Sequence, residues 1–447
     1  MSKTGRHGAR KLRPKAGAPP HAVAHHQRGM GLRFAELVKS GRGAWVAFLA
    51  VLGPGLLAGL SDDDPAGITT YSVLGADFGY RLLWIIPAST ILLVQFHLMA
   101  VRLGAATGKG FVGIIREKWG RVAGYFAVMG LLFANFGTIC AEYAGISAAG
   151  GLVGIPSWIS APAAGILISL VVVLGSFHRV ERVLLVISST LALYIIDGFL
   201  AGPDWGEVWH HSVIPHLPTG AAGWVAIAAA LGTTLAPWGL AFIQSYAVDK
   251  KISLETLSWA RVDVVIGSVL TGVIGLAIAV ACAATLHKAG VHITDAGDAA
   301  AALQPLAGRF ATVLFGAGLL GASLLAAAIV PIATAYSIAE GVGEPASLDL
   351  DSHHFQWFYA AFVGLTIAAV SVVSLPGLPL IPLIYTSQVL NAVVLPLHVI
   401  ALQLLANDAS MMGAARPGLW SRVAGWASIG LILACVAALA WTWMSGL

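Results

Sequence analysis

Residues 53–72 read Gly-Pro-Gly-Leu-Leu-Ala-Gly-Leu-Ser-Asp-Asp-Asp-Pro-Ala-Gly-Ile-Thr-Thr-Tyr-Ser, and they lie inside an otherwise apolar stretch of the chain. The consecutive carboxylates Asp62, Asp63 and Asp64 directly precede Pro65. One acidic residue at the centre of a membrane-spanning helix costs roughly 2.5–3.5 kcal/mol, so three cost about 8–10 kcal/mol. We therefore expect a cation or water to compensate these charges.

The composition is that of a polytopic membrane protein. The 447-residue chain is 58% hydrophobic and 10% charged, whereas soluble domains carry about 25% charged residues. A segment of about 17–25 apolar residues can cross a bilayer once. We count eleven such segments, at residues 44–79, 82–104, 122–148, 157–176, 182–201, 223–247, 259–285, 308–338, 356–374, 379–405 and 421–444. Residues 1–42 are basic and are predicted to be a disordered tail, so residues 43–447 form the transmembrane domain.

The distribution of lysine and arginine predicts the orientation in the membrane. If the N-terminus is cytoplasmic, the inner segments hold 22 of the 25 basic residues, and the outer segments hold only Arg81, Lys288 and Arg309. Positive residues concentrate on the cytoplasmic side of membrane proteins. We therefore predict a multi-pass protein of the cell membrane with a cytoplasmic N-terminus and an extracytoplasmic C-terminus.

A second interruption lies in the sixth predicted segment, where residues 231–239 read Leu-Gly-Thr-Thr-Leu-Ala-Pro-Trp-Gly. The first segment, interrupted at 61–67, and the sixth lead two successive groups of five segments. Broken helices at matching positions of two repeats indicate a transporter whose binding site lies between inverted repeats. The pattern thus predicts an all-α transporter domain with two inverted five-helix repeats plus one helix, in which spans 1 and 6 are broken.

The prolines explain how such breaks can hold an ion. Successive helical residues are rotated by about 100°, so three adjacent aspartates cannot share one helix face. Proline has no N–H group and so frees the carbonyl four residues earlier. Pro65 frees the Ser61 carbonyl, and Pro237 frees the Thr233 carbonyl. Free carbonyls beside a carboxylate favour a hard cation, although ordinary proline kinks are the alternative interpretation.

At these residues the chain resembles the Nramp family of divalent-metal transporters. Asp64-Pro65-Ala66-Gly67 is similar to the family's Asp-Pro-Gly-Asn, and the stretch 233–238 is similar to its Ala-x-x-Met-Pro-His. Further similar stretches are Thr107-Gly108-Lys109-Gly110, Ala141-Glu142-Tyr143-Ala144-Gly145 and Ser387-Gln388-Val389-Leu390-Asn391. The resemblance covers roughly residues 40–445 and implies the leucine-transporter-like fold.

The resemblance also implies a metal site, and this sequence departs from the family there. Asp64 keeps the metal-binding aspartate, and Thr233 takes the position whose backbone carbonyl binds metal. Gly67 replaces the family's asparagine ligand, and Ala236 replaces its methionine ligand. A thioether prefers transition metals, whereas Mg²⁺ keeps several waters and binds one or two carboxylates. The pattern is similar to that of the Nramp-related magnesium transporters and favours Mg²⁺, with Mn²⁺ as a second substrate.

Proton coupling is also expected to be weak or absent. Trp238 stands where proton-coupled relatives have a histidine, and Ile139 stands where some relatives have an aspartate. The alternatives are a proton-coupled transporter of Mn²⁺ or Fe²⁺, and a cation-coupled symporter of a small organic solute on the same fold.

Several other polar or break residues are candidates for the transport pathway or a gate, with helix packing as their alternative role. They are Asp62, Asp63, Pro65, Pro237, Trp238, Glu142, Gln244, Gln388 and Asn391.

A group of histidines stands apart from these candidates. His210, His211 and His216 follow the fifth predicted segment, near Asp204 and Glu207. They suggest a weak external metal-collecting site, with an ordinary solvated loop as the favoured alternative.

No enzymatic motif accompanies the predicted transport site. The sequence has no HExxH and no GxxxxGK[ST] motif, so we expect no catalytic residues. We also expect no cofactor other than the transported divalent cation. The partners predicted are that ion and the lipid bilayer, with no nucleic acid and no obligatory protein partner.

Overall fold

The structure is a computed structural model of the whole chain, and it describes residues 64–173, 193–249, 252–254, 257–343 and 356–445. The predicted tail, residues 1–42, lies outside these ranges, as do the candidates Asp62 and Asp63. Within the described ranges every regular element is helical and no strand is present. The expected all-α class is therefore confirmed.

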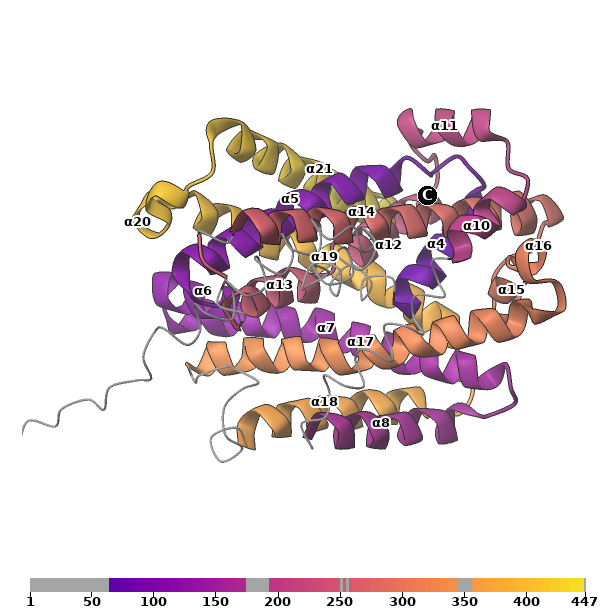
Figure 1. Cartoon of the computed structure of the whole chain (residues 1–447), viewed down its shortest axis with the longest axis horizontal. Helices are drawn as coiled ribbons and strands as arrows, with labels where there is room; N and C mark the ends of the chain where they lie inside the picture. The colour runs from indigo at the N-terminus through magenta and orange to yellow at the C-terminus, as the bar shows by residue number, and fades with distance from the viewer. Residues whose placement is uncertain (1–63, 174–192, 250–251, 255–256, 344–355, 446–447) are drawn as a thin grey trace, which may run out of the picture. The chain divides into compact units, whose positions relative to one another are not determined.

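Twelve α-helices of the described chain overlap the predicted membrane segments (Figure 1). They are α4 (Pro65–Phe78), α5 (Ile85–Thr107), α7 (Arg121–Gly151), α8 (Ser157–Val173), α10 (Leu193–Leu200), α12 (Ala221–Thr234), α13 (Pro237–Asp249), α14 (Leu257–Cys282), α17 (Ala311–Val342), α18 (Gln356–Val373), α19 (Leu380–Asn407) and α21 (Leu419–Ser445).

Shorter helices occupy segments that the hydropathy pattern places between spans. They are α6 (Phe111–Trp119), α11 (Trp205–Val213), α15 (Ala296–Ala301), α16 (Gln304–Ala307) and α20 (Ala409–Met412), and a π-helical turn, Ala283–His287, extends α14. These helices are too short to cross a bilayer.

Seven helical segments of the described chain are long and apolar enough to cross a membrane, and two shorter apolar helices, Ser157–Val173 and Phe358–Val373, accompany them. Each of the eleven predicted ranges contains at least one described helix. Because parts of the first, fourth and fifth ranges lie outside the described residues, the count of eleven crossings stays a prediction. Large apolar side chains such as Phe126, Phe133 and Leu170 are exposed on the helices, as expected for surfaces that lipid covers.

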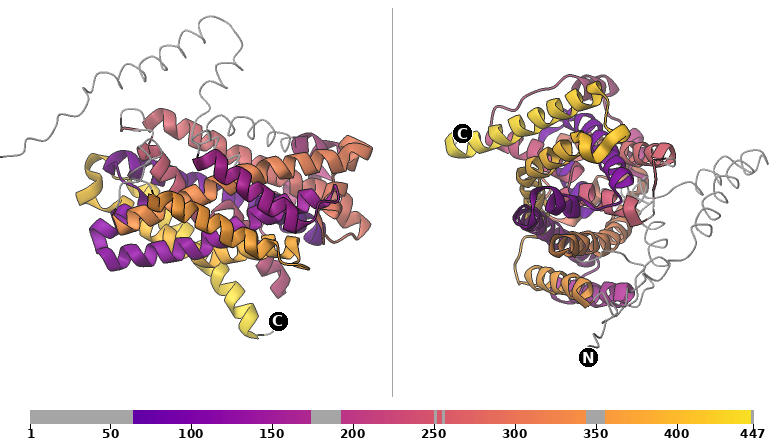
Figure 2. Two further views of the ribbon diagram at one scale, coloured as in Figure 1. Left: turned by 90° about the horizontal axis from the view of Figure 1, so that it is seen from below. Right: turned by 90° about the vertical axis from the view of Figure 1, so that its left-hand side faces the viewer.

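Helix α7 packs along both α17 and α19, and these are the two most extensive helix contacts of the described domain. Helices α8 and α18 lie side by side against α7 and α17, and the C-terminal end of α21 projects away from its neighbours (Figure 2). Helix α12 packs on α19 with almost no space between the backbones: a Cβ atom on Gly232 would lie 1.9 Å from the Gln388 carbonyl oxygen. This glycine therefore lets the end of α12 lie directly against α19.

Candidate metal-ion site at the two helix breaks

At the predicted first break, the described chain begins with Asp64, which caps α4, and residues 61–63 of that break lie outside the described ranges. The Asp64 backbone is extended (φ −73°, ψ 177°), and its Oδ1 atom accepts a 2.8 Å hydrogen bond from the Gly67 N–H. Pro65 is the first helical residue, a position where proline's missing N–H costs nothing. Residues 65–67 are thus helical, so the predicted interruption at 61–67 is wrong in its second half. The cap holds the Asp64 carboxylate at the positive end of the α4 dipole.

The second break falls between α12 and α13, as predicted. Helix α12 ends at Thr234, Leu235 leaves the helical conformation (φ −112°, ψ 40°), and α13 begins at Pro237. Because Pro237 has no N–H, the Thr233 carbonyl has no helical donor four residues later. Thr233 is 4% exposed, so its carbonyl is a buried oxygen available to a ligand.

Three hydroxyl groups link the two broken helices. The Thr234 hydroxyl lies 2.8 Å from the Tyr71 hydroxyl of α4 and 3.0 Å from the Ser89 hydroxyl of α5. It also donates a 2.7 Å hydrogen bond to the Ala230 carbonyl. We call Tyr71, Ser89 and Thr234 the hydroxyl link. The sequence analysis missed it, because its members are separated by up to 163 residues and each alone is an ordinary buried polar residue.

Helix α7 contacts the first break through a glycine and brings a second carboxylate to it. A Cβ atom on Gly145 would lie 2.4 Å from the Pro65 Cβ and 2.5 Å from the Ser323 hydroxyl of α17. One turn earlier on α7, the Glu142 carboxyl group interacts with that of Asp64. Glu142 is fully buried, and neither of its oxygens has a well-aligned hydrogen-bond partner in the part of the chain that the structure describes. The two carboxyl groups thus lie together in the buried interior.

The charge of the buried interior supports a cationic ligand. Among the described residues, the buried carboxylates are Asp64, Glu142, Asp197 and Asp263, and no lysine or arginine is buried. Two adjacent buried carboxylates repel each other unless a proton or a cation lies between them. An anionic solute would meet only further repulsion here.

The second break offers no charged side chain. Ala236 and Trp238 are buried in one apolar cluster with Ala66 of α4 and with Ile139 and Tyr143 of α7. The Trp238 ring lies 6.3 Å from the Phe242 ring, and its N–H has no partner among the described residues. The side chains of this cluster contain no acid or base that titrates near neutral pH.

Gln388 and Asn391 belong to a polar network between α19 and α7. The Asn391 amide donates to Gln388 Oε1 at 2.9 Å and to the Thr138 hydroxyl at 3.0 Å, and the Gln388 amide donates to Ser387. Gln388 and Asn391 therefore lie on one face of α19. The network lies where Gly232 meets α19, although a role in the transport pathway stays a prediction.

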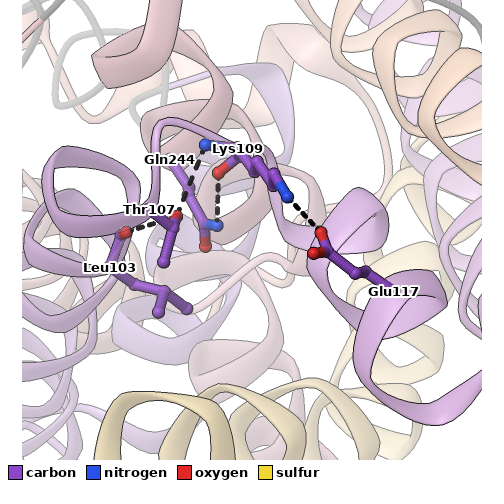
Figure 3. A network of polar contacts seen from close by, with 5 residues as sticks. All are labelled: Leu103, Thr107, Lys109, Glu117 and Gln244. Carbon is purple, nitrogen blue, oxygen red and sulfur yellow. Dashed lines mark hydrogen bonds and ion pairs between the residues drawn. The ribbon is translucent and has the colours of Figure 1, made fainter. Parts of the chain in front are cut away.

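Gln244 lies farther along α13 and contacts a different part of the domain (Figure 3). Its side-chain amide donates a 3.0 Å hydrogen bond to the Lys109 carbonyl, in the turn between α5 and α6. The same turn is stabilised by Thr107, whose hydroxyl donates to the Leu103 carbonyl, and by an ion pair between Lys109 and Glu117. Gln244 thus joins α13 to this turn, and its proposed part in the pathway stays a prediction.

Glu340 of α17 stabilises the neighbouring short helix, which was not predicted. Its Oε2 atom accepts hydrogen bonds from the N–H groups of Val112 and Gly113 at 3.1 Å, and its Oε1 atom accepts one from Ser245. A carboxylate at the N-terminus of a helix satisfies donors that otherwise lack partners. Unlike Glu142, Glu340 has structural partners for both oxygens.

Comparisons with known proteins agree with this architecture. The family model described as "Nramp: Natural resistance-associated macrophage protein-like" matches residues 55–442. A protein from Erwinia tasmaniensis called divalent metal cation transporter MntH is 31% identical over 281 residues, which cover 61% of this chain and 67% of that protein. A protein of the same name from Klebsiella pneumoniae strain 342 is 27% identical over 403 residues, which cover 88% of this chain and 94% of the relative.

Solved structures show the same fold. The Eremococcus coleocola manganese transporter, solved with an aromatic bis-isothiourea substituted compound, matches with a TM-score of 0.65 at 22% identity, covering 89% of this chain and 88% of that one. Mhp1, a nucleobase-cation-symport-1 family transporter in a closed conformation, matches with a TM-score of 0.53 at 14% identity, covering 88% and 93% of the two chains. With the family model spanning nearly the whole membrane domain, this chain belongs to the Nramp family.

Proposed function

We propose that this divalent metal cation transporter of the Nramp family carries a hard, partly hydrated dication, with Mg²⁺ favoured and Mn²⁺ as a second substrate. Asp64 and the Thr233 carbonyl are the proposed protein ligands. The observation that carries the proposal is the buried Asp64–Glu142 carboxyl pair, together with a second break that has no soft ligand.

The ligand types at the two breaks favour Mg²⁺ by their chemistry. A carboxylate and a main-chain carbonyl are hard oxygen donors, whereas Gly67 and Ala236 add no donor side chain. Mg²⁺ holds its waters tightly and binds through few protein oxygens. Without a thioether, the site also lacks the ligand that would prefer a softer transition metal.

Alternating access follows from where these ligands lie. Asp64 caps the start of α4 and Thr233 lies in the last turn of α12, so in this proposal the ion bridges the ends of two helices. The hydroxyl link connects α4, α5 and α12 next to the site, and we propose that these helices move as one group. When the ion leaves, the α4 cap and dipole still stabilise the Asp64 carboxylate, so the empty site can bind the next ion.

The proposed driving force is the membrane potential alone. Moving one charge through 100 mV yields about 2.3 kcal/mol, so a dication gains about 4.6 kcal/mol. Ile139 and Trp238 are buried and do not titrate near neutral pH, which supports uptake without protons. A second candidate function is proton-coupled Mn²⁺ or Fe²⁺ transport, favoured by the buried Glu142 carboxyl beside Asp64, which could hold a proton.

The substitution Ala236→Met tests the substrate preference. In proteoliposomes, we expect it to raise the ratio of Mn²⁺ to Mg²⁺ uptake by about tenfold, because a thioether ligand would contribute on the order of 1.4 kcal/mol to the softer ion. Ala236→Leu is the matched control, since it adds similar bulk without sulfur. An unchanged ratio in Ala236→Met, or an equal shift in Ala236→Leu, would refute the role given to this position.

A pH-sensitive dye inside the same liposomes tests the coupling. With an imposed inside-negative potential, we expect Mg²⁺ uptake without acidification of the lumen. Acidification that depends on the metal ion would instead establish the proton-coupled alternative. Glu142→Gln should then abolish the acidification, since an amide cannot carry the proton.

A further inference from the structure

His210, His211 and His216 are not the external metal-collecting site that the sequence suggested. In the part of the chain that the structure describes, no group of three or more histidine, cysteine or acidic side chains could hold a metal ion. His211 pairs instead with the Glu207 carboxylate, one helical turn earlier. The stronger candidate for a further binding site is a group of basic side chains on the side of the membrane that we predict to be cytoplasmic.

An open cavity of about 660 Å³ lies where α6 meets the first residue of α7 and the end of α17. Three glycines form part of its wall, and its charged side chains are Lys109, Arg116, Glu117, Arg121 and Glu340. We call this space the arginine pocket. Its three basic side chains all belong to one segment, residues 102–121, that joins two predicted membrane spans.

The two acidic side chains of the arginine pocket already have partners. Glu340 accepts hydrogen bonds from two N–H groups of α6 and from a serine of α13, and Glu117 forms an ion pair with Lys109. Among the described residues, Arg116 and Arg121 form no ion pair, and the Arg116 Nε atom is buried without a hydrogen-bond partner. A buried N–H group that lacks an acceptor is costly, so the pocket presents two unpaired arginines to an anionic ligand.

Two glycines hold the Arg116 side chain in place. A Cβ atom on Gly124 would lie 2.9 Å from the Arg116 Cβ, and a Cβ atom on Gly343 would overlap the Arg116 guanidinium. Gly343 ends α17 with φ 87°, a conformation that glycine adopts readily and other residues rarely do. The stem of Arg116 therefore lies against α7 and its guanidinium against the end of α17. A planar guanidinium fixed in this way is preorganised to bind the oxygens of a phosphate.

The start of α7 adds backbone donors to the same pocket. Arg121 is the first residue of this 31-residue helix, and the preceding Gly120 provides no side-chain cap. The first N–H groups of a helix have no acceptor within the helix, and together with the helix dipole they favour an anion. The arginine pocket thus combines two guanidinium groups with the uncapped end of a long helix.

A stripe of exposed apolar side chains leads away from the pocket along α7. Its members follow Arg121 at intervals of four, three and four residues, which places them on one face of the helix. They are Val122, Phe126, Met129 and Phe133, and each is between 61% and 71% exposed. Trp119, at the end of α6, is also exposed, and tryptophan is typical of the membrane–water interface. The arginine pocket therefore lies at the level of the lipid headgroups, with a path for acyl chains beside it.

We propose that the arginine pocket binds the phosphate of an anionic phospholipid, with Arg116 and Arg121 on the headgroup and the acyl chains along the apolar stripe of α7. Basic pockets between membrane helices on the cytoplasmic side suit such headgroups. A bound lipid would join α6, α7 and α17. The lipid site is separate from the Asp64–Thr233 site and does not depend on which ion the protein transports.

Lipid binding to the purified full chain in a neutral detergent tests this site. Native mass spectrometry measures the affinities for phosphatidylglycerol and phosphatidylcholine with identical acyl chains, and we expect phosphatidylglycerol to bind more tightly. Arg116→Gln and Arg121→Gln should each lower the phosphatidylglycerol affinity about fivefold, and the double variant about 25-fold, because each removes one basic residue from the headgroup. The phosphatidylcholine affinity should stay unchanged in all three variants.

Lys118→Gln is the matched control, because it removes the same charge from the same short helix. The Lys118 ammonium pairs with Asp408 rather than lining the pocket, so phosphatidylglycerol affinity should not change. Because Arg121 is exposed, its substitution tests the site even if Arg116→Gln fails to fold.

Glycerol 3-phosphate, which has the phosphate without acyl chains, separates a lipid from a soluble ligand. We expect it not to displace phosphatidylglycerol at matched concentration. Displacement would overturn the lipid assignment in favour of a soluble phosphate compound. Equal affinities for the two lipids, or an equal loss in Lys118→Gln and Arg121→Gln, would overturn the arginine pocket as a specific site.

Discussion

The two helix breaks share a proline at the start of the following helix, but they present different chemical groups. In both, a helix begins with a proline: Pro65 begins α4 and Pro237 begins α13. The residue before the proline differs, since Asp64 caps its helix with a carboxylate whereas Ala236 has only a methyl group. The first break therefore presents a charged side chain, and the second presents a main-chain oxygen in an apolar setting, as our proposal for the two ligands requires.

This difference determines which substitution is expected to remove the metal ligand at each break. A side-chain ligand is removed by changing its own residue. A carbonyl ligand is affected only by changing the backbone around it, through the proline that keeps it free. The first break should thus be sensitive at Asp64, and the second at Pro237 rather than at Thr233.

The largest expected effect is the loss of transport in Asp64→Ala. Removing the carboxylate takes away the one charged ligand and leaves Glu142 alone in the pocket. We expect Mg²⁺ uptake in proteoliposomes to fall at least about 100-fold, equivalent to about 2.7 kcal/mol. Asp77→Ala, at the other end of the same helix, is the control and should transport normally. Uptake retained in Asp64→Ala would remove the first break from the site.

The second break should respond to Pro237→Ala more than to Thr233→Ala. Alanine at 237 restores an N–H group that can bond the Thr233 carbonyl and continue the helix, so we expect uptake to fall by about tenfold. Thr233→Ala keeps the carbonyl and should stay within about twofold of the parent, well under the tenfold that 1.4 kcal/mol represents. If Thr233→Ala proves the more damaging, the second break contributes a side chain and the contrast between the breaks fails.

A smaller effect is expected from the hydroxyl link that connects the breaks. Thr234→Val keeps the shape but leaves the hydroxyls of Tyr71 and Ser89 without their shared partner. Interhelical hydrogen bonds in membranes contribute about 1–2 kcal/mol at most in model peptides, so we expect a loss of that size in the free energy of unfolding. Denaturant unfolding in detergent micelles measures it.

Thr234→Ser is the matched control because it keeps the hydroxyl and should retain most of the stability. Equal stability of Thr234→Val and the parent would show that the hydroxyl link does not hold the breaks together.

Much of this architecture could be predicted from local patterns. Apolar segments marked the helices, and the helix break at 235–236 followed from Pro237 within the predicted range. The extent of the first break was less predictable. The sequence Asp64-Pro65 is compatible with either an interruption or the start of a helix. The hydrogen bond from the Gly67 N–H to the Asp64 side chain shows that a helix starts here. The short helix α6 was missed because its stability depends on Glu340, more than 220 residues away.

By itself, the sequence determined that this is a polytopic membrane protein with two proline-initiated breaks. Apolar composition and proline affect helix formation within a few residues of their own position, so both can be interpreted from local sequence. The sequence also determined the ligand types on offer, since Gly67 and Ala236 carry no donor atom in their side chains. Only the tertiary structure decided that Asp64 meets Glu142, that Thr234 joins Tyr71 and Ser89, and that Arg116 lies against the end of α17. Such contacts depend on how helices pack, and packing is a property of pairs of surfaces that no single segment specifies.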